Sequence, residues 1–313
     1  MARYLFVLSR EHPPLAAAEC RSLHQEAEWE DYHGHLLGTV GELSTRMAFT
    51  RRCLEVLHRG GDKEGWPEPP RPEGTVRVER LALDGGTVGK GIARRMVLDW
   101  LGRPEVDLER PDETYWLVSG KGGLLVCREA WTNTGGFQAR ANQRRPAPHP
   151  TSLPPKLARA MVNLAGPVGE VLDPFCGSGG ILLEASLMGV TAKGVDIDEA
   201  MLDRARRNLA AYGAEAELVH GDALEHEEEA ECVVTDLPYG RSSKAEDLEG
   251  IYRTFLTKAH RMTRTMVVGF PDLVDGEALA EKEGWSVRRS FDWPLHRGLR
   301  KRILVLHSWS SEA

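Results

Sequence analysis

The sequence predicts an α/β fold with two unequal parts, a C-terminal doubly wound sheet and a smaller α+β region before it. From residue 156 to residue 313, short apolar stretches alternate with helix-like stretches, as in a parallel sheet with crossover helices. Residues 138–155 are rich in proline and separate the two parts. A chain of 313 residues is long enough to bury two cores.

Residues 1–59 are expected to form a small α+β domain of the ferredoxin-like type. A proline pair at 13–14 is tolerated in a first helical turn, so it marks the start of a helix. The elements expected in chain order are a strand over Tyr4–Leu8, a helix from Pro13 to about Glu28, a strand over Leu36–Val40 and a helix over Thr45–Leu57.

Residues 60–137 are expected to form a second small domain, because the loop at 60–74 is rich in Pro, Gly and Glu and the strand pattern restarts after it. The segment Val106–Asp112 with its flanking strand resembles the signature of the THUMP domain, an RNA-binding module found beside RNA-modifying enzymes. The Gly-Lys pairs at 89–90 and 120–121 lack the first glycine of a P-loop. The expected elements are strands over Val76–Leu81, Tyr115–Val118 and Leu124–Arg128, and a helix over Gly91–Leu101.

Residues 138–155 are predicted to be a stiff linker. The prolines at 146, 148 and 150 each disfavour the helical conformation for the residue before them. Thr151 or Ser152 is positioned to cap a helix that starts near Pro154 and continues through Leu164. Such a linker would pass the edge of the second domain at a fixed distance.

The second half, residues 156–313, is predicted to contain seven strands with helices between the first six. The last two strands are separated by a short polar turn, so an antiparallel hairpin at the sheet edge is expected. This arrangement, with the terminal pair reversed, resembles the Rossmann-like domain of class I S-adenosylmethionine methyltransferases. The strands are expected over Glu170–Asp173, Thr191–Val195, Ala216–Val219, Cys232–Asp236, Met266–Phe270, Val287–Trp293 and Arg302–His307.

Composition narrows the classes of function. No apolar stretch reaches the roughly 18 residues of a membrane span, and the apolar start is too short for a signal peptide, so a cytoplasmic protein is expected. A net charge of −7 argues against nucleic-acid binding over the whole surface, although basic stretches at Arg128–Arg145 and Val287–His307 fit local contacts. Free thiols and no metal site are expected, because the cysteines form no C-x-x-C pair: Cys20, Cys53, Cys127, Cys176 and Cys232.

A glycine-rich turn follows the first strand of the second half. Glycines are needed where a ligand approaches the backbone closely, and Asp173 before the turn suits a cationic ligand. A dinucleotide site would need glycine at position 182, which is Leu182, so a nicotinamide cofactor is disfavoured. The residues that would line this ligand site are Asp173, Phe175, Cys176, Gly177, Ser178 and Gly179.

The next strands also end in acids. Asp196, followed by Ile197, can bond two ribose hydroxyls, and Asp222, followed by Ala223, can accept an adenine amino group. Asp236 ends the fourth strand. Any one aspartate could be a turn former, but four in succession on the edge where open α/β sheets bind ligands predict a binding site.

The tetrad Asp236-Leu237-Pro238-Tyr239 closes the fourth strand. The Asp236 carboxylate, which would also border the cofactor, and the Leu237 carbonyl can accept the two N–H bonds of an amino group. Pro238 stiffens the turn, and Tyr239 can stack on the face of a flat base. The tetrad is therefore predicted to hold the amino group of a nucleobase.

These motifs carry a close resemblance. The turn D-P-F-C-G-S-G at 173–179 followed by D-L-P-Y is similar to methyltransferases that modify exocyclic amino groups of bases. The segment His149–Arg159 resembles the archaeal and eukaryotic THUMP-containing tRNA guanine-N2 methyltransferases. The resemblance implies S-adenosylmethionine as cofactor, with His149 and Thr151 among its contacts, and guanosine at tRNA position 10 as substrate. That family usually has (D/N)-P-P-Y, so Leu237 replaces a proline and the turn loses some preorganisation.

Charge and resemblance together predict that the N-terminal half and the junction hold tRNA. Arg140, Arg144 and Arg145 would contact the RNA backbone, and Arg241 would contact a flanking phosphate. Some relatives in that family work with a small zinc-binding activator subunit. Nothing in the sequence decides whether this chain needs one, or whether it adds one methyl group or two.

Two alternatives stay open, and a third is disfavoured. The same chemistry could act on another tRNA position or on ribosomal RNA. A DNA amino-methylase shares the tetrad, but a THUMP-like front half does not fit it, so DNA is not expected as a partner. The chain could also be an RNA-binding scaffold with an inactive methyltransferase fold, against which the four aspartates and Tyr239 argue.

Overall fold

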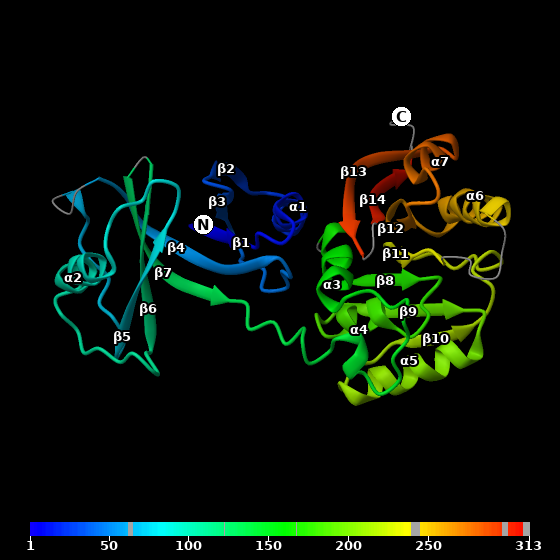
Figure 1. Ribbon diagram of the computed structural model, residues 1–313, viewed down its shortest axis with the longest axis horizontal. Helices are drawn as coiled ribbons and strands as arrows, with labels where there is room; N and C mark the ends of the chain where they lie inside the picture. The colour runs from blue at the N-terminus through cyan, green and yellow to red at the C-terminus, as the bar shows by residue number, and fades with distance from the viewer. Residues whose placement is uncertain (62–64, 122, 167, 239–244, 296–299, 309–313) are drawn as a thin grey trace. The chain divides into compact units, whose positions relative to one another are not determined.

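The computed structural model describes residues 1–61, 65–121, 123–166, 168–238, 245–295 and 300–308 (Figure 1). The chain divides into two compact units. The first comprises Met1–Thr45 and Phe49–Thr134, and the second comprises Arg46–Ala48 and the chain from Gly135 onward. Within the described residues, each unit is built on one seven-stranded sheet.

The first unit consists of β1 (Ala2–Leu8), α1 (Pro13–Leu23), β2 (Glu28–Tyr32), β3 (His35–Val40), β4 (Thr50–Gly60), β5 (Val76–Ala82), α2 (Lys90–Trp100), β6 (Glu113–Gly120) and β7 (Gly123–Thr132). The strand order is β2-β3-β1-β4-β7-β6-β5. Strands β5 and β6 are parallel and are joined through α2, whereas the other neighbours are antiparallel. This is the α+β region that the sequence predicts.

The helix predicted over Thr45–Leu57 is wrong. Residues Thr50–Gly60 form β4, a central strand that pairs with both β1 and β7. Because β4 has neighbours on both sides and is covered in part on both faces, its apolar residues do not alternate cleanly, and a short stretch of that kind can be mistaken for a helix. The first helix also ends at Leu23, and the polar strand β2 begins at Glu28 on the sheet edge, where charged side chains are tolerated.

The second unit consists of η2 (Asn142–Arg144), α3 (Pro155–Leu164), β8 (Glu170–Asp173), α4 (Gly180–Ser186), β9 (Thr191–Asp196), α5 (Glu199–Ala211), β10 (Glu217–His220), β11 (Val233–Asp236), α6 (Ala245–Met262), β12 (Thr265–Pro271), α7 (Gly276–Lys282), β13 (Trp285–Pro294) and β14 (Arg300–Ser308). The strand order is β10-β9-β8-β11-β12-β14-β13. The seven predicted strands are confirmed within two residues at each end. Strands β8, β9 and β10 lie side by side and point the same way in Figure 1.

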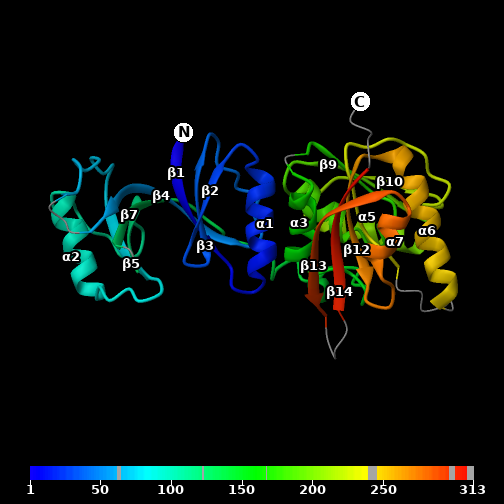
Figure 2. The ribbon, with the colours of Figure 1, turned by 90° about the horizontal axis from the view of Figure 1, so that it is seen from above.

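The predicted terminal hairpin is confirmed, with one correction to its direction. Strand β14 is antiparallel to both β12 and β13, and Figure 2 shows β13 beside β14. Strand β13 therefore points the same way as the parallel strands, so β14 alone opposes them. Insertion of β14 between β12 and β13 places its residues one strand away from β11, which shapes the site described below.

The core of the second unit lies between the sheet and α6 and α7. Trp285, Tyr252, Phe255 and Phe270 are its largest fully buried side chains, and strand residues from β8, β11, β12 and β14 pack against them. Helix α3 packs against α4, and α4 packs against α5. This packing fixes the strands whose carboxyl ends form the site.

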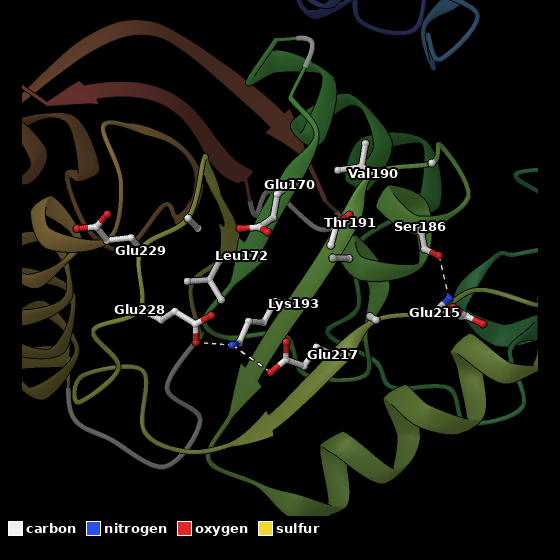
Figure 3. A pocket seen from close by; sticks show the side chains of 14 residues that line it. Glu170, Leu172, Ser186, Val190, Thr191, Lys193, Glu215, Glu217, Glu228 and Glu229 are labelled. Atoms are coloured by element: carbon white, nitrogen blue, oxygen red, sulfur yellow. Dashed lines mark hydrogen bonds and ion pairs between the residues drawn. The ribbon is translucent and has the colours of Figure 1, made fainter.

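The helix expected between the third and fourth strands of this sheet is not present, since residues 221–232 form a loop without a helix. In a helix over this segment, Glu225 would face Glu229 and Glu227 would face Glu231, and like charges four residues apart destabilise a helix. An acidic cavity borders this loop and the first residues of β8, β9 and β10, and in it Lys193 pairs with Glu217 and Glu228 (Figure 3).

Across the residues that the structure describes, none of the helices combines the length and the apolar character needed to cross a bilayer. The five cysteines are all buried and free.

Candidate active site

A cavity of about 620 Å³ opens at the carboxyl ends of the parallel strands of the second unit. With the exception of Gly179, every residue predicted to bind the cofactor lines it, and so do Leu237 and Pro238. Tyr239 and Arg241 lie outside the described residues. The predicted lining residues that meet at this cavity are His149, Thr151, Asp173, Phe175, Cys176, Gly177, Ser178, Asp196, Ile197, Asp222, Ala223 and Asp236.

The glycine turn between β8 and α4 is held in a ligand-binding shape by its backbone. Gly177 and Gly179 have φ values of +51° and +79°, a region in which side chains other than glycine are strained. Asp196 on β9 accepts a 2.7 Å hydrogen bond from the Gly177 amide, which ties the turn to the next strand. A Cβ on Gly179 would lie 3.0 Å from the Ala205 Cβ on α5, so this glycine serves close packing against α5.

Asp173 is almost fully buried at the base of the cavity. Its Oδ1 accepts hydrogen bonds from the Thr235 hydroxyl at 2.7 Å and from the Phe175 amide at 3.2 Å. Burial raises the pKa of Asp173 to about 7, and the nearby carboxylates of Asp236 and Asp196 add to the rise. An unpaired carboxylate at this depth costs free energy, so the position favours a cationic ligand.

Asp196 and Asp222 are more exposed and already organise the backbone around them. Asp196 Oδ1 accepts the Asp198 amide at 2.9 Å, and Asp222 Oδ1 accepts the Leu224 amide at 2.8 Å. Ile197, immediately after Asp196, is 67% exposed although it is aliphatic. An exposed apolar side chain between two oriented carboxylates provides a surface for a flat ring with polar edges.

The predicted linker is pinned across the second unit by side chains from α5. Asn208, fully buried, accepts the Ala147 amide at 3.0 Å and donates to the carbonyls of Ala147 at 3.1 Å and Ser178 at 3.0 Å. Ser152 does not cap α3, whose N-cap is Pro154; its hydroxyl pairs with that of Ser178 at 2.7 Å. These bonds bring the segment with His149 and Thr151 to the cavity.

Sequence reasoning did not identify Asn208. A polar side chain on the inward face of α5, at helical spacing from Leu202, Ala205 and Leu209, was the available signal.

The tetrad is fixed from behind. The Leu237 amide donates to the Gly269 carbonyl at 3.0 Å, and the Tyr252 hydroxyl donates to the Pro238 carbonyl. The Leu237 side chain is fully buried in the core under α6. Packing of the Leu237 side chain therefore restrains the turn. A proline at this position would restrain it through its ring instead.

Asp236 pairs with a lysine that sequence reasoning missed. The Lys301 ammonium on β14 donates to Asp236 Oδ1, and the Lys301 side chain is only 1% exposed whereas that of Asp236 keeps 15%. Burial raises the pKa of Asp236 and lowers that of Lys301, and the attraction between the two opposes both shifts. Removal of either partner would leave a buried charge uncompensated.

The structure does not support the predicted RNA contacts of Arg140 and Arg145. The Arg140 guanidinium forms two bonds, at 2.7 Å and 3.1 Å, with Glu184, a fully buried carboxylate that also binds Arg159 at 2.9 Å. Arg145 is 3% exposed, and burial lowers its pKa. Arg140 therefore holds the start of the linker to α4, and the Arg145 Nε donates to the Arg140 carbonyl at 3.0 Å. Arg144 is exposed, and its contact with RNA stays a prediction.

Among the residues that the structure describes, no group of three or more His, Cys, Asp or Glu side chains is arranged to hold a metal ion.

Comparisons with known proteins show which family the chain belongs to. Residues 142–297 match the model of the RMKL-like methyltransferase domain. A tRNA (guanine(10)-N2)-dimethyltransferase from Methanothermobacter thermautotrophicus is 33% identical, with 96% of this chain and 98% of the relative covered. This chain belongs to the tRNA (guanine(10)-N2)-dimethyltransferase family. A further relative of that name, from Pyrococcus abyssi, is 34% identical over 65% of this chain and 64% of its own length.

Solved structures confirm the fold of this member of the tRNA (guanine(10)-N2)-dimethyltransferase family. TrmN from Thermus thermophilus aligns with a TM-score of 0.53 at 22% identity, covering 98% of this chain and 99% of that chain. The α/β fold class, with a Rossmann-like methyltransferase sheet after an α+β region, is therefore as the sequence predicts.

Proposed function

We propose that the protein transfers methyl groups from S-adenosylmethionine to the N2 amino group of guanosine 10 in tRNA, forming N2-methyl- or N2,N2-dimethylguanosine. The observation that carries this proposal is the convergence of Asp173, Asp196, Asp222 and Asp236, from the ends of four strands, on one cavity. Membership of the family supports the base and the position, because two curated relatives carry that activity in their names.

The cavity fits the proposed methyl donor. Its volume of about 620 Å³ falls within the ~300–1,000 Å³ that small-molecule sites occupy. Asp173 would pair with the donor's ammonium group, and Asp196 would accept hydrogen bonds from its ribose hydroxyls. Asp222 would accept a hydrogen bond from the adenine amino group, and the exposed Ile197 would contact the face of the adenine ring. When bound, S-adenosylmethionine supplies a methyl group already activated on a sulfonium, so the protein needs to position the acceptor rather than to donate a proton.

Asp236 and the Leu237 carbonyl are assigned to the acceptor amine. The bonds behind Leu237 and Pro238 prevent the turn from moving away when a base enters. Holding a nitrogen in line with an activated methyl group can contribute up to about 7–11 kcal/mol. Tyr239 is proposed to stack on the base, worth roughly 1–3 kcal/mol, against the few kcal/mol needed to extrude a base from a stem.

The first unit is proposed to bind the tRNA, with residues 60–137 as a THUMP module after a ferredoxin-like domain over 1–59, and with 138–155 as the linker to the domain 156–313. Helix α2 supports an RNA contact, because Lys90, Arg94 and Arg95 are exposed on it beside the exposed Ile92, with no acidic residue in its first turn. Arg144 would add a phosphate contact at the junction.

A small zinc-binding activator subunit is proposed as an optional partner. Among the described residues, β10 is the terminal strand of the second sheet and pairs only with β9, so its outer edge could accept a strand from a partner. If an activator is required, the purified chain will methylate tRNA only when that subunit is added.

We also propose that the reaction takes place in the cytoplasm.

The experiment that tests the proposal is nucleoside mass spectrometry of unmodified tRNA transcripts incubated with the protein and labelled S-adenosylmethionine. Label should appear as N2-methyl- or N2,N2-dimethylguanosine in a transcript with guanosine at position 10 and not in a matched transcript with adenosine there. Label at another tRNA position or in ribosomal RNA would reassign the substrate. Absence of label with every RNA, together with absence of cofactor binding, would favour an RNA-binding scaffold.

A further inference from the structure

The pair formed by Lys301 and Asp236 depends on a gap in the strand between them. Strand β12 lies between β11 and β14, so the two side chains must meet across it. Asp236 is opposite Gly269 in the β11–β12 register, and Gly269 is opposite Ile303 in the β12–β14 register. Lys301 is two residues from Ile303 along β14 and therefore points to the same face of the sheet.

Gly269 is what allows the lysine to reach the carboxylate. A Cβ built on Gly269 would stand 2.6 Å from Asp236 Oδ1, closer than real Cβ contacts, and 3.1 Å from Lys301 Cδ, which is also a tight approach. A glycine inside a buried strand loses packing and backbone entropy, and it marks a place where another group must approach closely. The group that approaches here is the Lys301 side chain.

We infer that Lys301 is a positioning residue for the methyl acceptor: through Oδ1 it holds the Asp236 carboxylate in one orientation and presents Oδ2 to the amino group of the base. This inference rests on the proposed function of Asp236. The lysine bond takes Oδ1, on the side of β12, while the carboxylate lines the cavity and keeps part of its surface exposed. A carboxylate that is both ionised and fixed accepts a hydrogen bond without reorganisation when the base arrives.

The other titratable groups that face Asp236 do not favour its ionised form. Asp173 on β8 is a like charge when it is ionised. Tyr252 on α6 is neutral over the assayed pH range, because burial and then Asp236 raise its pKa to about 12. Strand β12 contributes only Gly269 at this point. Lys301 on β14 is therefore the cation that offsets burial at Asp236, and without it the pKa of Asp236 rises further.

The test compares Lys301→Met with wild type by single-turnover methyl transfer to tRNA between pH 5.5 and 9. Methionine keeps the length of the stem and removes the charge. At pH 7 the rate should fall about tenfold to a hundredfold, as expected for a misplaced reacting group. S-adenosylhomocysteine affinity should stay within about threefold, and the acid limb of the rate profile should move to higher pH, so that the deficit narrows as pH rises.

Lys193→Met is the matched control. It removes an ion-paired lysine from β9 of the same sheet, in the cavity of Figure 3 and away from Asp236, and it should keep the wild-type pH profile. If Lys301→Met does not fold, Gly269→Ala replaces it, because a Cβ there separates the pair and leaves both charges in place.

A deficit equal at every pH, an unchanged rate or a parallel loss of cofactor affinity would overturn the positioning role alone. A wild-type protein inactive on every tRNA would overturn the proposed function as well.

Discussion

Cofactor affinity should depend on pH through Asp173. The pKa of this buried carboxyl lies at about 7 in the free protein, so the group is mostly protonated below neutrality. Only the ionised form can pair with an ammonium group, and affinity should therefore rise as pH rises toward 7. For a pKa of 7 the ionised fraction grows from about 3% at pH 5.5 to about 50% at pH 7, an affinity gain of about fifteenfold or ~1.6 kcal/mol.

The assay is isothermal titration of S-adenosylhomocysteine at pH 5.5, 6, 6.5 and 7, in two buffers of different ionisation enthalpy. The range stays below the ordinary pKa of an α-amino group, ~7.7–8.0, so the ligand keeps its charge. Binding at pH 6 should release about 0.9 proton. Asp173→Asn retains the acceptor for Thr235 and should bind more weakly with a flat pH dependence. Wild-type affinity that is flat over this range, or an Asp173→Asn variant with the wild-type slope, would refute the assignment.

Three further substitutions test the framework of the site. Asn208→Leu should cost about 1–3 kcal/mol in urea unfolding for each buried backbone group left unpaired and should weaken cofactor binding through Ser178. Glu184→Gln should lower unfolding free energy by about 3–5 kcal/mol, because buried arginines lose their counter-charge; a change below 1 kcal/mol would contradict this. Gly194→Ala should cost about 1–3 kcal/mol in thermal unfolding, since its Cβ would lie 2.4 Å from Leu182 Cδ1.

Three acids of the site could be predicted because each one ends a short strand. Asp173, Asp196 and Asp236 are the last residues of β8, β9 and β11, and parallel strands bring their carboxyl ends to one edge. The local sequence was therefore enough to predict both each strand and the aspartate at its end. The same logic found the terminal hairpin from the short turn between its strands.

Lys301 could not be found in this way, because it lies 65 residues from Asp236 and meets it only after β14 inserts beside β12. The glycine at 269 within an apolar stretch was the one local sign of a close approach. Arg140 was assigned to RNA from its charge, whereas its partner Glu184 is 44 residues away and fully buried. Helix and strand were confused over Thr45–Leu57, where pairing on both sides of β4 overrides the local pattern.

In the proposed reaction, one cavity holds the methyl donor with three aspartates and the acceptor amine with the turn at Asp236. The most direct measurement pairs single-turnover methyl transfer with S-adenosylhomocysteine titration for Asp236→Ala. Transfer to guanosine 10 should be abolished while cofactor affinity stays within about tenfold, since the removed contacts belong to the acceptor. Retained transfer, or a loss of cofactor affinity large enough to explain the lost rate, would contradict it.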